Sequence, residues 1–112
     1  GDKDEPWFVA DKDFDNNILI VAQGHNHPSL FHKELVADQL HWISGFPPKN
    51  TKNISAKIRY RQKDQKCRLS LLNNDECVVK FKNSQFAITP GQSVVFYNGE
   101  ECLGGAIINN WR

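Results

Sequence analysis

The sequence predicts an all-β protein built on a small closed or nearly closed β-barrel, preceded by the strand-rich end of another domain. From residue 54 onward, apolar and polar residues alternate with the period of two that is typical of half-buried strands. Turn signals separate these short runs, and no helical run could cover an open sheet. Closure into a barrel is a common way for such strands to avoid exposed edges.

The first part of the chain also reads mainly as strands. Residues 7–13 and 16–24 predict two strands joined by a turn at Phe14–Asn17. Residues 27–43 are ambiguous, because their apolar positions have near-helical spacing while β-branched and aromatic residues surround them. We expect a strand to about Val36, followed by a turn or a short helical piece.

A linker then divides the chain. Residues 44–53 contain a glycine, two prolines and a polar run, a composition typical of a loop. We therefore expect two units, residues 1–46 and residues 47–112, with the barrel in the second.

Within the second unit, each strand-like run ends at a recognisable turn. In residues 54–60, the alternation places Ile54, Ala56, Ile58 and Tyr60 on one face and Ser55, Lys57 and Arg59 on the other. Pro90-Gly91 suits a type II turn, and Asn98-Gly99 suits a type I′ hairpin. Gly104-Gly105 predicts a bulge or a sharp corner, where a side chain would be crowded out.

Composition and motifs exclude several classes of function. No apolar run is long enough for a membrane helix, and no signal peptide is visible, so we expect a cytoplasmic protein. The chain contains no Met and opens GDKDEPW, from which we expect a piece of a longer polypeptide. The cysteines Cys67, Cys77 and Cys102 are odd in number and form no C-x-x-C pair, which favours buried, reduced thiols. His25, His27 and His32 lie in a loop-like segment without a completing carboxylate or thiol, so we predict no metal site.

One basic segment rises above this background. Residues 52–68 hold seven Lys or Arg and a single acid, Asp64, and residues 51–112 carry ten basic against five acidic residues. Such a face is typical of proteins that neutralise the phosphates of a nucleic acid. An edge strand that uses Lys and Arg to resist aggregation explains the segment equally well at this point.

The segments EPWFVADKD, NNILIVAQG, LHWISGFPP, AKIRYRQ and TPGQSVVFYNGEECLGGAII resemble, in order and spacing, the C-terminal portion of the bacterial tRNA-specific 2-thiouridylases. Ala106 stands where the family has a third glycine. The resemblance implies that residues 1–46 end a central domain and that residues 47–112 form a barrel similar to domain 2 of translation elongation factors.

The resemblance also implies a function. The family uses ATP and Mg²⁺ to convert the wobble uridine of the tRNAs for Lys, Glu and Gln to 2-thiouridine. The sulfur is delivered by a persulfide on a catalytic cysteine, which receives it from a relay protein. The family's SGGVDSS-type ATP motif is absent from these 112 residues, so we expect no catalytic residue and no bound cofactor here. The three cysteines match barrel positions and not the catalytic cysteines.

For this portion of the enzyme, the resemblance implies a tRNA-binding role at Arg59, Tyr60 and Gln92. Lys57 and Arg61 would extend the positive field beside Arg59. Strand alternation points Arg59 and Tyr60 to opposite faces, so Tyr60 must lie at a strand end or reach the RNA through its hydroxyl or backbone. The alternative is a structural or partner-docking barrel, for example for the sulfur-relay protein, without a direct RNA role.

Overall fold

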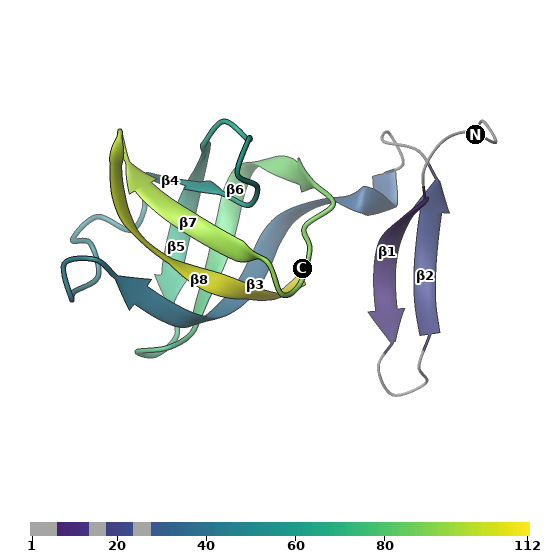
Figure 1. Cartoon of the computed structure of the whole chain (residues 1–112), viewed down its shortest axis with the longest axis horizontal. Helices are drawn as coiled ribbons and strands as arrows, with labels where there is room; N and C mark the ends of the chain where they lie inside the picture. Colours follow the sequence, from purple (N-terminus) through teal and green to yellow (C-terminus); the bar gives the residue numbers. More distant parts are fainter. Residues whose placement is uncertain (1–6, 14–17, 24–27) are drawn as a thin grey trace.

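The computed structural model describes residues 7–13, 18–23 and 28–112 and consists almost entirely of β-strands (Figure 1). Its elements are β1 (Trp7–Asp13), β2 (Ile18–Gln23), the 3-10 helix η1 (Pro28–Leu30), β3 (Phe31–Trp42), β4 (Ile54–Lys57), β5 (Gln65–Leu71), β6 (Cys77–Phe86), β7 (Ser93–Asn98) and β8 (Glu101–Trp111). The first two form a two-stranded antiparallel sheet. The turn predicted at Phe14–Asn17 lies outside the described residues. The described part of the chain contains no helix long and apolar enough to cross a membrane.

The six remaining strands form a closed antiparallel barrel in the order β3-β6-β5-β4-β7-β8. The predicted all-β barrel is thus confirmed, and it is fully closed because β3 pairs with both β6 and β8. Alternate residues of each strand point inward and fill the barrel. The largest of the fully buried strand side chains are Leu35, Cys77, Val79, Val94, Phe96 and Ile108.

The strand β3 differs from its sequence prediction. We expected a turn or short helical piece after Val36, but the strand continues to Trp42. A bulge explains the misleading spacing: Gln39 has a φ of 55°, and the β3–β8 register shifts between Asp38 and His41. The extra residue changes which positions face inward, so that the buried set passes from Leu35 and Ala37 to Leu40 and Trp42. Although β3 precedes the linker at residues 44–53, both of its hydrogen-bonded neighbours are barrel strands.

The predicted hairpin between β7 and β8 is confirmed, but its turn differs in position and type. Its two loop residues are Gly99 and Glu100, one position later than expected, since Asn98 already pairs with Glu101. Only Gly99 has a positive φ, of 60°, which fits a type II′ turn and not the predicted type I′.

The predicted bulge near Gly104-Gly105 is confirmed. The register shifts between Phe96 and Tyr97, opposite Gly104 and Cys102. A Cβ on Gly104, whose φ is 154°, would lie 2.0 Å from the carbonyl oxygen of His41 on the neighbouring strand. Only a glycine allows β3 and β8 to approach this closely.

Candidate nucleic-acid interface

The connection between β4 and β5 places the basic segment on the surface. The strand ends at Lys57, and Ile58 is the last residue that points into the core. The side-chain oxygen of Gln62 accepts a hydrogen bond of 2.9 Å from the backbone N–H of Ile58. The backbone N–H of Gln62 donates to the carbonyl oxygen of Arg59 at 3.2 Å. These two bonds turn the chain away from the strand direction.

This turn determines where Tyr60 points. Alternation predicted that Tyr60 would share the inner face with Ile58, but its side chain is 94% exposed. The reason is that Tyr60 lies beyond the end of β4, where the period of two no longer applies. Tyr60 thus occupies the strand-end position that the sequence left open as one alternative.

A side-chain bridge holds the turn to the barrel. The amide nitrogen of Gln62 donates a hydrogen bond of 2.8 Å to the side-chain oxygen of Gln85, which is only 4% exposed. The Gln85 amide nitrogen in turn donates to the carbonyl oxygen of Asn83 at 2.9 Å. Sequence reasoning missed both glutamines, although Gln62 closes the basic run AKIRYRQ.

The guanidinium of Arg59 forms hydrogen bonds with the backbone at the end of β6. One terminal nitrogen donates hydrogen bonds to the carbonyl oxygens of Phe86 and of Ala87, the latter at 2.7 Å. The group also lies over the Phe86 ring, 5.5 Å from its centroid. Partial burial lowers the pKa of Arg59, but a guanidinium remains charged at any physiological pH. Among the described residues, its other N–H groups make no hydrogen bond and can contact a ligand.

The turn at residues 89–92 presents Gln92 beside this arginine. The N–H of Gln92 donates to the carbonyl oxygen of Thr89 at 3.3 Å, and Gly91 has a φ of 87°. These values confirm the predicted type II turn at Pro90-Gly91. Two hydrogen bonds of 2.8 Å tie Gly91 and Gln92 to the backbone of Ile108. The exposed Gln92 side chain therefore projects from a fixed backbone.

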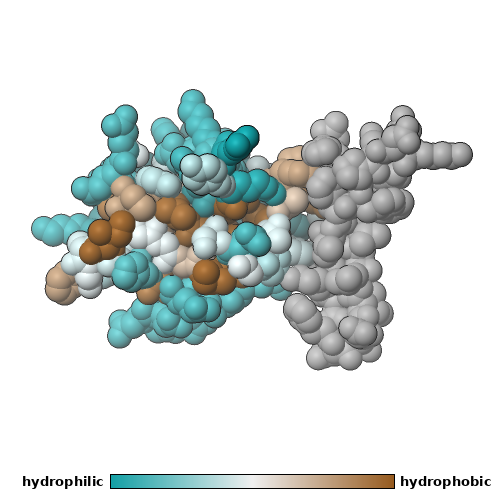
Figure 2. Space-filling view, in the orientation of Figure 1, coloured by the Kyte–Doolittle hydropathy of each residue, from teal (hydrophilic) through white to brown (hydrophobic). Residues whose placement is uncertain are grey.

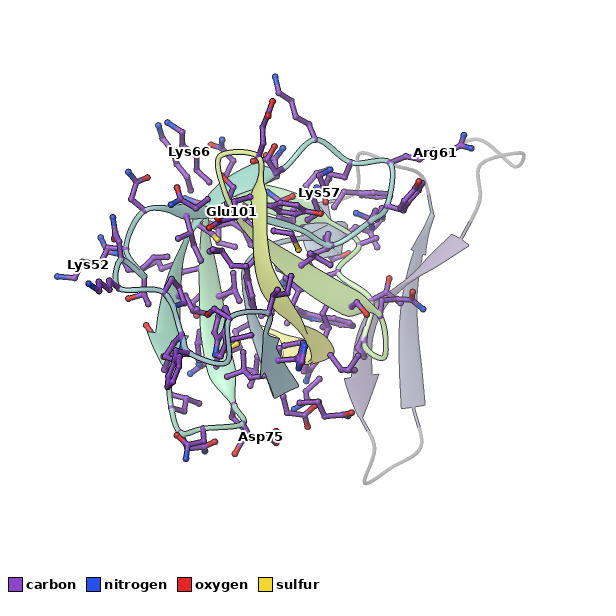
Figure 3. All side chains as sticks on the ribbon, turned by 60° about the vertical axis from the view of Figure 1, so that its left-hand side comes forward. Lys52, Lys57, Arg61, Lys66, Asp75 and Glu101 are labelled. Atoms are coloured by element: carbon purple, nitrogen blue, oxygen red, sulfur yellow. The ribbon has the colours of Figure 1, made fainter. Side chains whose placement is uncertain are left out.

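These segments meet in one concavity of about 350 Å³, which we call the Tyr60 groove. Its lining residues are Lys57, Ile58, Arg59, Tyr60, Gln92, Ser93, Val95 and Tyr97. Four of the five predicted site residues are thus brought together from separate segments of the chain. The fifth, Arg61, is exposed but does not line the groove, and Figure 3 shows it extending away from Lys57.

Tyr97 is a further residue of the groove that the sequence reasoning missed. The Lys57 ammonium lies over its ring, 5.1 Å from the centroid. Tyr97 follows the fully buried Phe96 on β7, so the period of two could have placed it on the outer face. Two aromatic rings and two cations therefore border the same concavity.

The anti-aggregation explanation of the basic segment does not hold for β4. This strand pairs with β5 on one side and β7 on the other, so it has no free edge to protect. In the view of Figure 2, hydrophilic residues gather along the top of the barrel, where the β4–β5 connection rises in Figure 1. The charge on this surface thus needs another explanation.

The cysteines and histidines do not form a reactive centre in the described part of the chain. Burial raises the pKa of both Cys67 and Cys77 to about 12, so these thiols are protonated, as expected. The prediction of burial is wrong for Cys102, which is exposed. His25 and His27 lie outside the described residues, and His32 contacts the carbonyl oxygen of Ser29 at 3.0 Å. No three potential metal ligands cluster among residues 7–13, 18–23 and 28–112.

Comparison with known proteins gives the family. Residues 32–108 match a family described as the aminomethyltransferase beta-barrel domain. The chain belongs to this family. The matched range begins within β3 and ends within β8, so the family match covers all six barrel strands.

The chain is also similar to curated proteins named tRNA-specific 2-thiouridylase MnmA, which confirms the predicted resemblance. It is 54% identical over 105 residues to those of Shigella boydii serotype 4 (strain Sb227) and Escherichia coli O157:H7. It is 53% identical over the same length to that of Escherichia coli (strain K12 / DH10B). Each match covers 94% of this chain but only 28% of the relative, so the chain spans little more than a quarter of these proteins.

Proposed function

We propose that this barrel is a tRNA-binding module that holds RNA in the Tyr60 groove. The observation that carries the proposal is the convergence of Lys57, Arg59, Tyr60 and Gln92 on one concavity. They come from the end of β4, the turn after it and the turn at 89–92, so the fold and not the sequence alone brings them together. Cations beside exposed aromatic rings are the usual elements of single-stranded RNA recognition.

Each side chain has a distinct part in this proposal. Lys57 and the unused N–H groups of Arg59 neutralise backbone phosphates, and Tyr60 stacks on an unpaired base. The Gln92 side chain donates a hydrogen bond to the backbone or to a base edge. Arg61, outside the groove, adds to the positive field around it. Phosphate contacts orient an RNA without reading its sequence, so the module positions tRNA and does not select it.

The names of the relatives extend the proposal to the whole enzyme. We place this module in a tRNA-uridine 2-sulfurtransferase that acts in the cytoplasm on the tRNAs for Lys, Glu and Gln and receives sulfur from a relay protein. ATP and Mg²⁺ serve that enzyme in a domain with the SGGVDSS-type motif, which these 112 residues lack. The high pKa of the buried Cys67 and Cys77 thiols also makes them unsuitable for carrying a persulfide.

Binding of tRNA to the 112-residue chain, measured over a range of salt concentrations, tests the proposal. Tyr60→Ala should weaken binding by about 5- to 150-fold without changing the salt dependence, because it removes stacking and not charge. Tyr60→Phe keeps the ring and should bind nearly as wild type. Lys57→Ala should reduce the slope of log K against log salt by about 0.7 to 0.9.

Lys49→Ala is the matched control for Lys57→Ala, since Lys49 is exposed but does not line the groove. If Tyr60→Ala and Lys57→Ala both bind tRNA like this control, the groove does not bind RNA. The structural or partner-docking barrel is then the better description of the domain.

A further inference from the structure

A second concavity on the outer wall of the barrel is lined mainly by cations. This groove, which we call the lysine groove, has a volume of about 510 Å³. Its basic lining residues are Lys33, Lys52, Lys66, Arg68, Lys80 and Lys82. The other lining residues, Asn53, Cys67 and Phe81, are uncharged, so no acid lines the groove. None of the six cations was among the predicted site residues.

Four of the cations lie in an arrangement that is unfavourable in the absence of a ligand. Arg68 of β5 is directly opposite Lys80 of β6 in the antiparallel ladder. Lys66 lies two residues before Arg68, and Lys82 lies two residues after Lys80. Because side chains alternate along a strand, both are on the same face as Arg68 and Lys80. Like charges directly opposite each other destabilise a sheet.

The groove has little compensation from carboxylates. The one ion pair among the described residues joins Lys80 to Glu34 at 4.0 Å, with side chains 63% and 32% exposed. A pair this long and this exposed contributes little. A bound polyanion would supply the missing negative charge.

Protection of a strand edge does not explain these cations. In the barrel, β5 pairs with β4 and β6, and β6 pairs with β5 and β3. Neither strand has an unpaired edge that lysines would need to shield. Shielding of an edge is therefore not the reason for these cations.

The lysine groove is adjacent to the Tyr60 groove on the same wall. Ser55 of β4 pairs with Tyr97 on one side and with Lys66 on the other. Neighbouring strands lie about 4.8 Å apart, so roughly 10 Å separate the strand of Tyr97 from the strand of Lys66. Figure 3 shows Lys52 and Lys66 projecting from the outer surface.

We propose that the lysine groove binds a further stretch of RNA backbone, so that one RNA runs across β7, β4, β5 and β6 from the Tyr60 groove. This inference rests on the proposed function for the identity of the polyanion. The six cations contact phosphates only, and they lengthen the binding site without adding sequence preference. The Tyr60 groove provides stacking, and the lysine groove provides most of the salt dependence.

The double variant Lys66→Ala/Lys82→Ala of the 112-residue chain tests this division. Its matched control is Lys49→Ala/Arg112→Ala, which removes two cations that line neither groove. The first should lower the slope of log K against log salt by about 1.4 to 1.8, which weakens binding roughly 25- to 60-fold at 0.1 M salt. The control should change the slope by much less. Equal slopes for the two double variants would overturn the inference.

Two further measurements separate the possible outcomes. If Tyr60→Ala and Lys57→Ala bind tRNA normally while Lys66→Ala/Lys82→Ala has the reduced slope, the proposed Tyr60 site fails and the lysine groove is supported. The binding of a 12-nucleotide RNA and of a 12-residue polyglutamate should both be measured, for the wild type and for Lys66→Ala/Lys82→Ala. If Lys66→Ala/Lys82→Ala loses polyglutamate binding but keeps RNA binding, the groove docks an acidic protein and our inference is wrong.

Discussion

The guanidinium of Arg59 donates a hydrogen bond of 2.7 Å to the carbonyl oxygen of Ala87, which lies 28 residues further along the chain. Ala87 has a φ of 47°, and its carbonyl also accepts a hydrogen bond from the Thr89 hydroxyl at 2.9 Å. Arg59 therefore supports the segment that leads into the turn bearing Gln92. The residue has a structural role in addition to the phosphate contact that the sequence suggested.

Two substitutions should separate these roles of Arg59. Arg59→Ala should lower the free energy of unfolding by about 1 to 2 kcal/mol, because carbonyls lose a charged donor. Arg59→Lys should lose similar stability, since an ammonium cannot reproduce the planar fork of the guanidinium. Only Arg59→Ala should reduce the salt slope of tRNA binding, by about one. If Arg59→Ala has a normal salt slope of tRNA binding but reduced stability, Arg59 has the structural role alone. Urea unfolding and binding titrations provide both quantities.

The bridge from Gln62 to Gln85 should be important for both stability and RNA binding. Gln62→Ala leaves the Ile58 N–H and the buried Gln85 side chain without their partner, so we expect a loss of about 1 to 3 kcal/mol. Binding of tRNA should weaken as well, because the bridge holds the turn that carries Tyr60. Gln65→Ala is the control, since within the described part of the chain the Gln65 side chain hydrogen-bonds the nearby Lys63 carbonyl and no other group. Similar urea midpoints for the two variants would contradict this account.

Gly104 should tolerate no side chain. Gly104→Ala places a methyl group 2.0 Å from the backbone oxygen of His41, so β3 and β8 must separate. We expect a loss of about 3 kcal/mol or more in the free energy of unfolding. Gly99→Ala has a comparable backbone problem, with a φ of 60°, but nothing within 4 Å of the new Cβ. It should lose only about 1 kcal/mol, and thermal unfolding of the two proteins would show the difference.

The buried thiols predict a loss of stability at alkaline pH. Burial raises the pKa of Cys67 and Cys77 to about 12, above the value near 8.5 of an unfolded thiol. Below the pKa of the unfolded thiol, both thiols are protonated in the folded and the unfolded protein, so their contribution to the free energy of unfolding is complete. It is lost as the pH rises through the window up to about 12, by at most about 1.4 kcal/mol per pH unit for each thiol. The double variant Cys67→Ala/Cys77→Ala should show a shallower decline in urea unfolding at pH 9 to 11. An identical decline would assign the effect to other groups.

What the sequence predicted depended on how local each feature is. The turn at Pro90-Gly91 follows from the chemistry of two adjacent residues, and the structure has it as predicted. The length of β3 depends on a bulge at Gln39, which no local pattern in the sequence marks. The exposure of Tyr60 depends on a hydrogen bond that the Ile58 N–H donates to the side-chain oxygen of Gln62, four residues later.

The lysine groove depends on still longer relationships. Its cations come from β3, β5, β6 and the segment before β4, and only the strand order of the barrel makes them neighbours. In the sequence, Arg68 and Lys80 belong to separate runs, and the repulsion between them becomes apparent only when the ladder sets them opposite each other. The basic run at residues 52–68 contains Lys52, Lys66 and Arg68 of this groove, but the run alone could not show that they face Lys33, Lys80 and Lys82.

The closing seam between β3 and β8 also sets the timing of folding during synthesis. Trp42 pairs with Gly104, and Leu35 pairs with Trp111, so the seam cannot form until β8 has left the ribosome. At about 5 to 20 residues per second, roughly 3 to 14 seconds pass between the synthesis of Trp42 and that of Trp111. During this interval one edge of β3 is without its partner strand. The nascent domain is therefore open to wrong pairing along β3 until β8 has been made.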